Sequence, residues 1–270
     1  MKQRLVTILV VVAAAAPGSL LAQGPRKVKQ NDVPLIISVA GSYVLTENLH
    51  VSDPEVTAIR IVTDDVLIDL GGFSIQGPEL GPVGAGSAID AVVRSNITVR
   101  NGTVRGFYDP ASACIHLPGR NNKVENMGVQ HCPQEAVFVG SSGAVVDNHI
   151  SDSASGINTD DGTLVARNTV HSASNHCIMT SGGAPSGPGG VTVVGNNCRN
   201  SGTGIRVIGS GNRIQDNVIT GTGTGLDLSG SVNSYFASNL LQGNATPVVG
   251  GGDDLDGATV DAALSNVVLP

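Results

Sequence analysis

Short runs in which every second residue is Val, Ile or Leu recur along most of the chain. They are separated by segments rich in Gly, Ser and Asn, as in Ile97–Arg100 and Gly204–Val207. A period of two predicts β-strands that turn one row of side chains inward and the other outward. A repeat that contains helices needs amphipathic segments of about 10 to 12 residues, which these short runs do not provide. The pattern therefore predicts an all-β protein.

One asparagine follows an apolar run in each repeat, and successive asparagines are separated by 25, 22, 20, 28, 21 and 22 residues. They are Asn101, Asn126, Asn148, Asn168, Asn196, Asn217 and Asn239. Asn tolerates the left-handed backbone of a sharp bend, and stacked Asn amides can hydrogen-bond to one another. We predict a structural Asn ladder at one corner of a parallel β-helix (β-solenoid) of about eight coils, with a period of about 21 residues.

The repeat divides the chain into four expected parts. Residues 1–22 have the basic start and apolar stretch of a signal peptide, which predicts a secreted or periplasmic protein. Residues 23–62 are expected to form an N-terminal cap, residues 63–245 the parallel β-helix, and residues 246–270 a C-terminal cap or tail. The chain has no run of about 20 apolar residues, so we expect no membrane span.

Two segments resemble the opening coils of a known group of proteins. Asp65–Gly77 and Asn96–Phe107 are similar to the first coils of secreted right-handed parallel β-helix proteins of the pectate-lyase-like superfamily, and Gly41–Leu49 is similar to their N-terminal segment. The resemblance implies a right-handed parallel β-helix over about residues 35 to 245. It implies no single activity, because the same coils serve lyases, hydrolases, epimerases, adhesins and binding proteins.

The four cysteines of this exported chain predict two disulfides. Cys114 and Cys132 are 18 residues apart, and Cys177 and Cys198 are 21 apart, each close to one coil. Three connectivities are available to four cysteines, and this pairing needs the least displacement. The cysteines lack the C-x₂-C spacing of a zinc site.

The charge and the aromatic content refine this picture of the surface and the core. The net charge is -7, with 14% charged residues and no basic run in the body of the chain, which argues against nucleic-acid binding. Aromatic residues make up only 3% of the chain, which suits a narrow core of small and β-branched side chains. We therefore expect a solenoid with lightly charged outer faces.

One outward column of the predicted β-helix carries most of the candidate chemistry. It comprises Asp90, His116, Phe138, Asn158, Met179, Arg206 and Asp227. Arg206 and Asp227 fall on neighbouring coils, where a surface ion pair is favoured over a catalytic pair. Phe138 could stack on a sugar ring. The histidines of these coils do not have the spacing of a metal site.

A second candidate is the segment Asn158–Asp160, which is similar to the first acidic motif of polygalacturonases, enzymes that use carboxylic acids in hydrolysis. The later motifs of that family are missing, because Asn175–Ile178 has no carboxylate and Gly202–Gly204 has no histidine. A turn capped by its own Asp side chains is therefore favoured at Asp160 and Asp161. The weak catalytic candidates are Asp160, Asp161, Arg206 and Asp227.

Two functions remain open. The favoured one is an exported β-helix protein whose extended polar face binds a glycan or a protein, because no column carries a complete catalytic constellation. The alternative is a polysaccharide lyase or glycoside hydrolase that acts on an extracellular polysaccharide. The expected partners are an extracellular polysaccharide or a surface protein, and we expect no cofactor or metal, except calcium in the case of a lyase.

Overall fold

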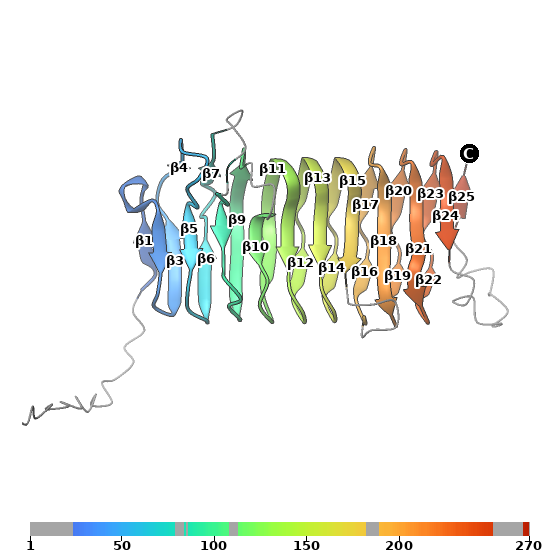
Figure 1. Cartoon of the computed structure of the whole chain (residues 1–270), viewed down its shortest axis with the longest axis horizontal. Helices are drawn as coiled ribbons and strands as arrows, with labels where there is room; N and C mark the ends of the chain where they lie inside the picture. Colours follow the sequence, from blue (N-terminus) through green and yellow to red (C-terminus); the bar gives the residue numbers. More distant parts are fainter. Residues whose placement is uncertain are drawn as a thin grey trace, which may run out of the picture.

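The computed structural model describes residues 24–78, 84, 86–107, 113–181, 189–250 and 267–269. These residues form a right-handed parallel β-helix of about nine turns, close to the eight predicted. Its rungs follow one another in chain order along the long axis (Figure 1). A short 3₁₀ helix, η1 (Gln30–Asp32), lies near the N-terminal end. The predicted signal peptide, residues 1–22, lies outside the described residues.

Three parallel sheets form the walls of the solenoid, and the long strands turn a corner and contribute to more than one sheet. Sheet 1 contains β1 (Arg26–Val28), β3 (Gly41–Leu45), β6 (Val66–Asp69), β9 (Ile97–Arg105), β11 (Lys123–Val139), β12 (Ala144–Val146), β14 (Leu164–Ala166), β16 (Thr192–Val194), β19 (Arg213–Gln215) and β22 (Tyr235–Ala237).

Sheet 2 contains β4 (Leu49–His50), β7 (Ser74–Gln76), β9, β11, β13 (His149–Thr159), β15 (Thr169–Ser181), β17 (Asn197–Arg199), β20 (Val218–Thr220), β23 (Leu240–Gln242) and β25 (Val267–Leu269). Sheet 3 contains β2 (Leu35–Ile37), β5 (Ile59–Ile61), β8 (Ile89–Asp90), β10 (Ala113–Leu117), β11, β13, β15, β18 (Thr203–Ser210), β21 (Thr224–Val232) and β24 (Thr246–Gly250).

The core consists of aliphatic columns, because each coil pairs in register with the next. The buried column of sheet 3 contains Ile59, Ile89, Ile115, Val137, Ile157, Ile178, Ile205 and Leu226. Burial of each such side chain contributes about 1.5–3 kcal/mol. Branched aliphatic side chains fill this narrow interior, which explains how the chain folds with so few aromatic residues.

The stack of rungs begins earlier in the chain than the predicted boundary at residue 63. Strand β1 pairs with β3, and β2 pairs with β5, in the same sheets as the later coils. Residues 26–61 therefore already form rungs of the solenoid. At the other end, β24 and β25 add rungs from the predicted tail, and residues 251–266 lie outside the described part. No helix in the described ranges has the length and apolar character needed to cross a bilayer.

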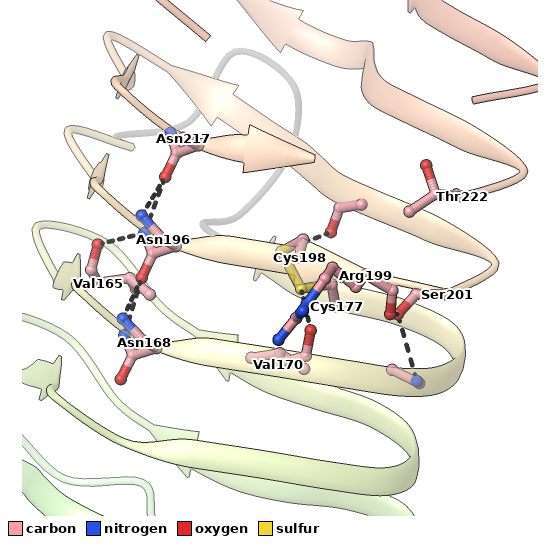
Figure 2. Close-up of a disulfide and its surroundings, with 12 residues drawn as sticks. Val165, Asn168, Val170, Cys177, Asn196, Cys198, Arg199, Ser201, Asn217 and Thr222 are labelled. Atoms are coloured by element: carbon pink, nitrogen blue, oxygen red, sulfur yellow. Dashed lines mark hydrogen bonds between the residues drawn. A yellow bond between two sulfur atoms is a disulfide. The ribbon is translucent and has the colours of Figure 1, made fainter. Parts of the chain in front are cut away.

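A buried Asn ladder fills the corner between sheets 1 and 2 over the last five coils. Asn196 lies between Asn168 and Asn217 (Figure 2). Its Oδ1 accepts hydrogen bonds from the backbone N–H and the Nδ2 of Asn168, at 2.9 and 3.0 Å. Its Nδ2 donates to Oδ1 of Asn217 and to the carbonyl of Val165, both at 3.0 Å. The ladder therefore satisfies polar groups that the corner buries.

The prediction that Asn101 and Asn126 belong to the same ladder is wrong. Both have a positive φ, 62° and 51°, and lie one position before the ladder, where their side chains reach solvent. Nδ2 of Asn126 donates to Oδ1 of Asn101 at 2.9 Å, which makes a separate, outer pair. The buried position is taken by Met127, whose backbone N–H donates to Oδ1 of Asn148. The early coils are thus offset by one residue from the later ones.

Two disulfides link neighbouring coils, with the pairing that the spacing favoured. Cys114 is bonded to Cys132, and Cys177 to Cys198, with Cα–Cα distances of 6.0 and 5.9 Å (Figure 2 shows the second). Gly156, on the preceding coil, lies in register with Cys177. A Cβ atom added to Gly156 would lie 2.6 Å from the carbonyl oxygen of Cys177. This crowded corner accepts only small residues at that position.

We predict that Asn196→Ala lowers the free energy of unfolding by about 2–4 kcal/mol, because it leaves buried donors and acceptors of the ladder without partners. Urea and thermal unfolding followed by circular dichroism measure this loss. Asn175→Ala, on an exposed site in β15, is the matched control and should change stability by less than about 0.5 kcal/mol. Equal effects of the two substitutions would contradict a structural role for the ladder.

Candidate functional site

The outward column predicted from the sequence exists in sheet 3, and we call it the sheet 3 column. Each member pairs in register with the next, and two further residues extend the column, Arg60 on the N-terminal side and Val249 on the C-terminal side. From β5 to β24 the column contains Arg60, Asp90, His116, Phe138, Asn158, Met179, Arg206, Asp227 and Val249. The period of two and the coil length were sufficient to predict this alignment.

The first half of the sheet 3 column joins an ion pair to an aromatic ring. Nδ1 of His116 lies 3.1 Å from Oδ1 of Asp90, and Nε of Arg60 lies 3.9 Å from Oδ2 of the same carboxylate. Burial alone would raise the pKa of Asp90, but the hydrogen bond and charge of His116 outweigh it and hold that pKa below its usual value. The ring centroid of His116 lies 5.3 Å from that of the half-buried Phe138.

A network of four side chains, which we call the Asn158 cluster, adjoins Phe138. Its members are Glu135, Asn158, Asp160 and Ser181. Nδ2 of Asn158 donates to Oε1 of Glu135 at 2.7 Å, and the Ser181 hydroxyl donates to Oδ1 of Asn158 at 2.8 Å. The same hydroxyl lies 3.4 Å from Oδ1 of Asp160. Asn158 therefore connects two carboxylates from neighbouring coils.

Both carboxylates of the Asn158 cluster hold their protons more tightly than usual. Burial raises the pKa of Glu135, the charge of Asp160 adds to the rise, and the hydrogen bond from Asn158 opposes it. Burial also raises the pKa of Asp160, together with the charge of Asp161, against the hydrogen bond from Ser181. Raised carboxyl pKa values are a feature of functional sites, where burial and like charges are combined.

The second half of the sheet 3 column contains the ion pair predicted between Arg206 and Asp227. Nε of Arg206 lies 3.5 Å from Oδ2 of Asp227 on the next coil. Nη1 of Arg206 lies 3.5 Å from Nε2 of His176, and burial and the charge of Arg206 lower the pKa of this histidine. The carboxylate of Asp227 also accepts hydrogen bonds from the backbone N–H and the hydroxyl of Ser229. These contacts engage both partners of the pair.

Sequence reasoning missed Glu135, a partly buried carboxylate of the face. Counting by twos from Phe138 predicts that residue 136 points outward, but Ala136 and Val137 are both buried. Strand β11 has one extra residue relative to β13 between Cys132 and Glu135. The same break in the alternation recurs in the next coils, where Gly156 and Ile157, and Cys177 and Ile178, are both buried. Asp161 follows β13, and its Oδ1 is buried without a hydrogen-bond partner among the described residues.

A separate hollow of about 550 Å³ lies at the corner between sheets 1 and 2, away from the sheet 3 column. Its wall is made mostly of small and polar residues and ends at the coil where the buried Asn ladder begins. They are Gly72, Asn101, Gly102, Thr103, Asn126, Met127, Gly128, Asp147 and His149. Asp147 is engaged by Arg167 through two hydrogen bonds of 2.8 Å.

The donor set for a transition metal is sparse. All four cysteines are in disulfides. No group of three or more His, Cys, Asp and Glu side chains could hold a metal ion in the part of the chain that the structure describes. His149 and His171 come close, with ring centroids 5.4 Å apart, but they pack edge to face and have no third ligand. Met127, whose side chain carries a thioether sulfur, is buried in the core with only 2% of the residue exposed.

The fold is similar to that of a larger solved protein, described as the complex structure of XylC with xylose. The two structures superpose with a TM-score of 0.55 at 14% sequence identity, which indicates a shared fold. The similarity covers 72% of this chain but 38% of XylC, so the chain spans well under half of that protein's length. Among curated proteins, none matches the chain.

Family membership follows from the repeat region itself. Residues 62–256 match the family described as periplasmic copper-binding protein (NosD). This segment contains the Asn ladder, both disulfides and the sheet 3 column from Asp90 to Val249. Because the match spans well over half of the 270 residues, the chain belongs to the NosD family of periplasmic β-helix proteins.

Proposed function

We propose that the protein binds a glycan along the sheet 3 column, with Phe138 as the stacking platform. The observation that carries the proposal is the half-buried Phe138 ring between the His116–Asp90 pair and the Asn158 cluster. Sugar rings present C–H groups that pack on an aromatic face and hydroxyl groups that need hydrogen-bond partners. Phe138 offers the aromatic face for the C–H groups, and the Asn158 cluster offers hydrogen-bond partners for the hydroxyl groups.

The location of the protein fits such a ligand. The chain belongs to a periplasmic family and contains two disulfides, so it is a periplasmic or secreted protein. The solved structure of XylC with its similar fold holds xylose, which supports a sugar as the class of ligand here. An extended column in register over successive coils suits a polymer better than a single small molecule.

The family description implies copper, but the residues of this chain do not fit that metal. Copper favours thiolate, thioether and imidazole ligands. All four cysteines are oxidised, and the described residues contain no cluster of three His, Cys, Asp or Glu side chains that could hold a metal ion. We therefore derive no step of the proposed function through copper.

A second candidate function is hydrolysis of the bound glycan, and the raised pKa of Glu135 favours it. A carboxyl group whose pKa is raised donates a proton to the leaving oxygen more readily, while a second carboxylate acts on water or the sugar. Glu135 and Asp160 are the pair available for these roles. Asp161, Arg206 and Asp227 line the same face as supporting groups.

We expect Phe138→Ala to weaken binding of a neutral polysaccharide by about tenfold or more, since a stacking contact of this kind contributes about 0.5–1.5 kcal/mol beyond its buried area. Affinity electrophoresis in gels that contain xylan or galactan measures the change. Tyr235→Ala is the matched control, because Tyr235 is an exposed aromatic residue on β22 in sheet 1. Unchanged retardation of Phe138→Ala would refute the proposed platform.

If the bound glycan is cleaved, we expect Glu135→Gln to reduce turnover by about 10²–10⁴-fold, the usual contribution of a general acid. Release of reducing ends and of unsaturated products, with and without calcium, measures cleavage by hydrolysis and by elimination. Asp216→Asn, at an exposed corner of sheet 1, is the control. Wild-type turnover in Glu135→Gln would remove Glu135 from the reaction.

We expect the stability of the protein to depend on pH through Glu135. The pKa of Glu135 is raised in the folded state. With respect to this group, the stability of the folded protein is therefore fully retained below pH 4.5, and it decreases as the pH rises through the folded pKa. Glu135→Gln keeps the acceptor for Asn158 and removes this titration. The variant should therefore have a higher Tm than the wild type at pH 7 and the same Tm near pH 3. A lower Tm at pH 7 would contradict the assignment.

A further inference from the structure

We infer that the glycan bound at the sheet 3 column is neutral, and that the column discriminates against polyuronates and other polyanionic polysaccharides. The inference rests on the proposed function and names its substrate class. It follows from the placement of charged side chains on sheet 3, where the arginines face carboxylates and the central carboxylates have no salt-bridge partner among the described residues.

The strands of sheet 3 contain two guanidinium groups in their described residues, and each faces a carboxylate of the neighbouring coil. Arg60 lies 3.9 Å from Asp90, and Arg206 lies 3.5 Å from Asp227. The side chain of Asp227 is only 19% exposed, so an incoming uronate would have to compete with a partly desolvated partner for Arg206. At both positions a uronate would therefore have to compete with a carboxylate that the guanidinium group already faces.

The two histidines of the face do not supply a free cation either. His116 is engaged by Asp90 at 3.1 Å. His176 lies beside the guanidinium of Arg206, and the same surroundings lower its pKa, which keeps the imidazole neutral at neutral pH. Positive charge on the sheet 3 column is thus confined to positions that face a carboxylate of a neighbouring coil, as Arg60 and Arg206 do.

The centre of the column is acidic. Glu135 and Asp160 flank Asn158, Asp161 follows directly, and none of the three carboxylates has a salt-bridge partner among the described residues. A uronate stacked on Phe138 would bring a further negative charge to half-buried carboxylates, which is unfavourable because like charges in a poorly solvated site repel strongly. A hydroxyl group at the same place can donate a hydrogen bond to any of these oxygens.

The direction of the hydrogen bonds also favours hydroxyl ligands. One N–H of Asn158 already donates to Glu135, and its Oδ1 already accepts from Ser181, so most of the remaining capacity of the cluster is on carboxylate oxygens. Acceptor-only groups match the O–H donors of a neutral sugar and cannot bind another carboxylate without a proton or a cation between them. The aromatic ring and the acceptors together select for a neutral, hydroxyl-rich chain.

The test compares two polymers that differ only in charge: polygalacturonate, and the galactan obtained from it when its carboxyl groups are reduced to alcohols. Binding to the full chain is measured by isothermal titration at low ionic strength, with and without calcium. We expect the neutral polymer to bind at least about tenfold more tightly than the charged one. The difference should shrink as salt screens the repulsion.

The double variant Glu135→Gln/Asp160→Asn supplies the charge control, because it removes two negative charges and keeps side-chain shape. We expect it to bring the two affinities within about threefold of each other, while Asp216→Asn leaves the discrimination intact. Equal or tighter binding of polygalacturonate by the wild type, with or without calcium, would overturn the inference and leave glycan binding standing. Absence of binding to both polymers, and to xylan, would overturn the proposed function itself.

Discussion

The structure depends on the parallel, in-register pairing of each coil with the next. Backbone hydrogen bonds set neighbouring strands about 4.8 Å apart, so every position stacks on its counterpart one coil away. The same rule produces the aliphatic core, the Asn ladder and the sheet 3 column. Its consequence is that one side chain acquires its neighbours from chain segments about 21 residues before and after it, rather than from distant elements. Stability and function are therefore both arranged along one axis.

The repeating part of the fold could be predicted from the sequence because the repeat carries its own register. The period of two and the coil length place Phe138 beside Asn158, and Arg206 beside Asp227. The pairing of Cys177 with Cys198 follows from the same arithmetic. These predictions needed no knowledge of tertiary contacts, since in a solenoid the tertiary neighbour is the next repeat.

Local departures from the period could not be predicted in the same way. Met127, rather than Asn126, lies in the buried corner, because the early coils are offset by one residue. The spacing between successive asparagines does not reveal this offset. Glu135 precedes two buried residues, Ala136 and Val137, and this break in the alternation recurs at the same corner of the next coil, at Gly156 and Ile157. The candidate site lies at such a break. Irregular backbone is often found beside functional residues, because it re-aims a side chain that the regular strand would point elsewhere.

The two disulfides lie on either side of the coils that carry the Asn158 cluster. Cys114–Cys132 joins coils at the start of this region, and Cys177–Cys198 joins coils at its end. In a linear stack each coil is held only by its neighbours, so opening starts at the ends and spreads inward one rung at a time. Covalent links on both sides halt this fraying before it reaches Glu135 and Phe138. The terminal rungs can therefore open and close, or be lost to proteases, while the middle of the solenoid keeps its shape.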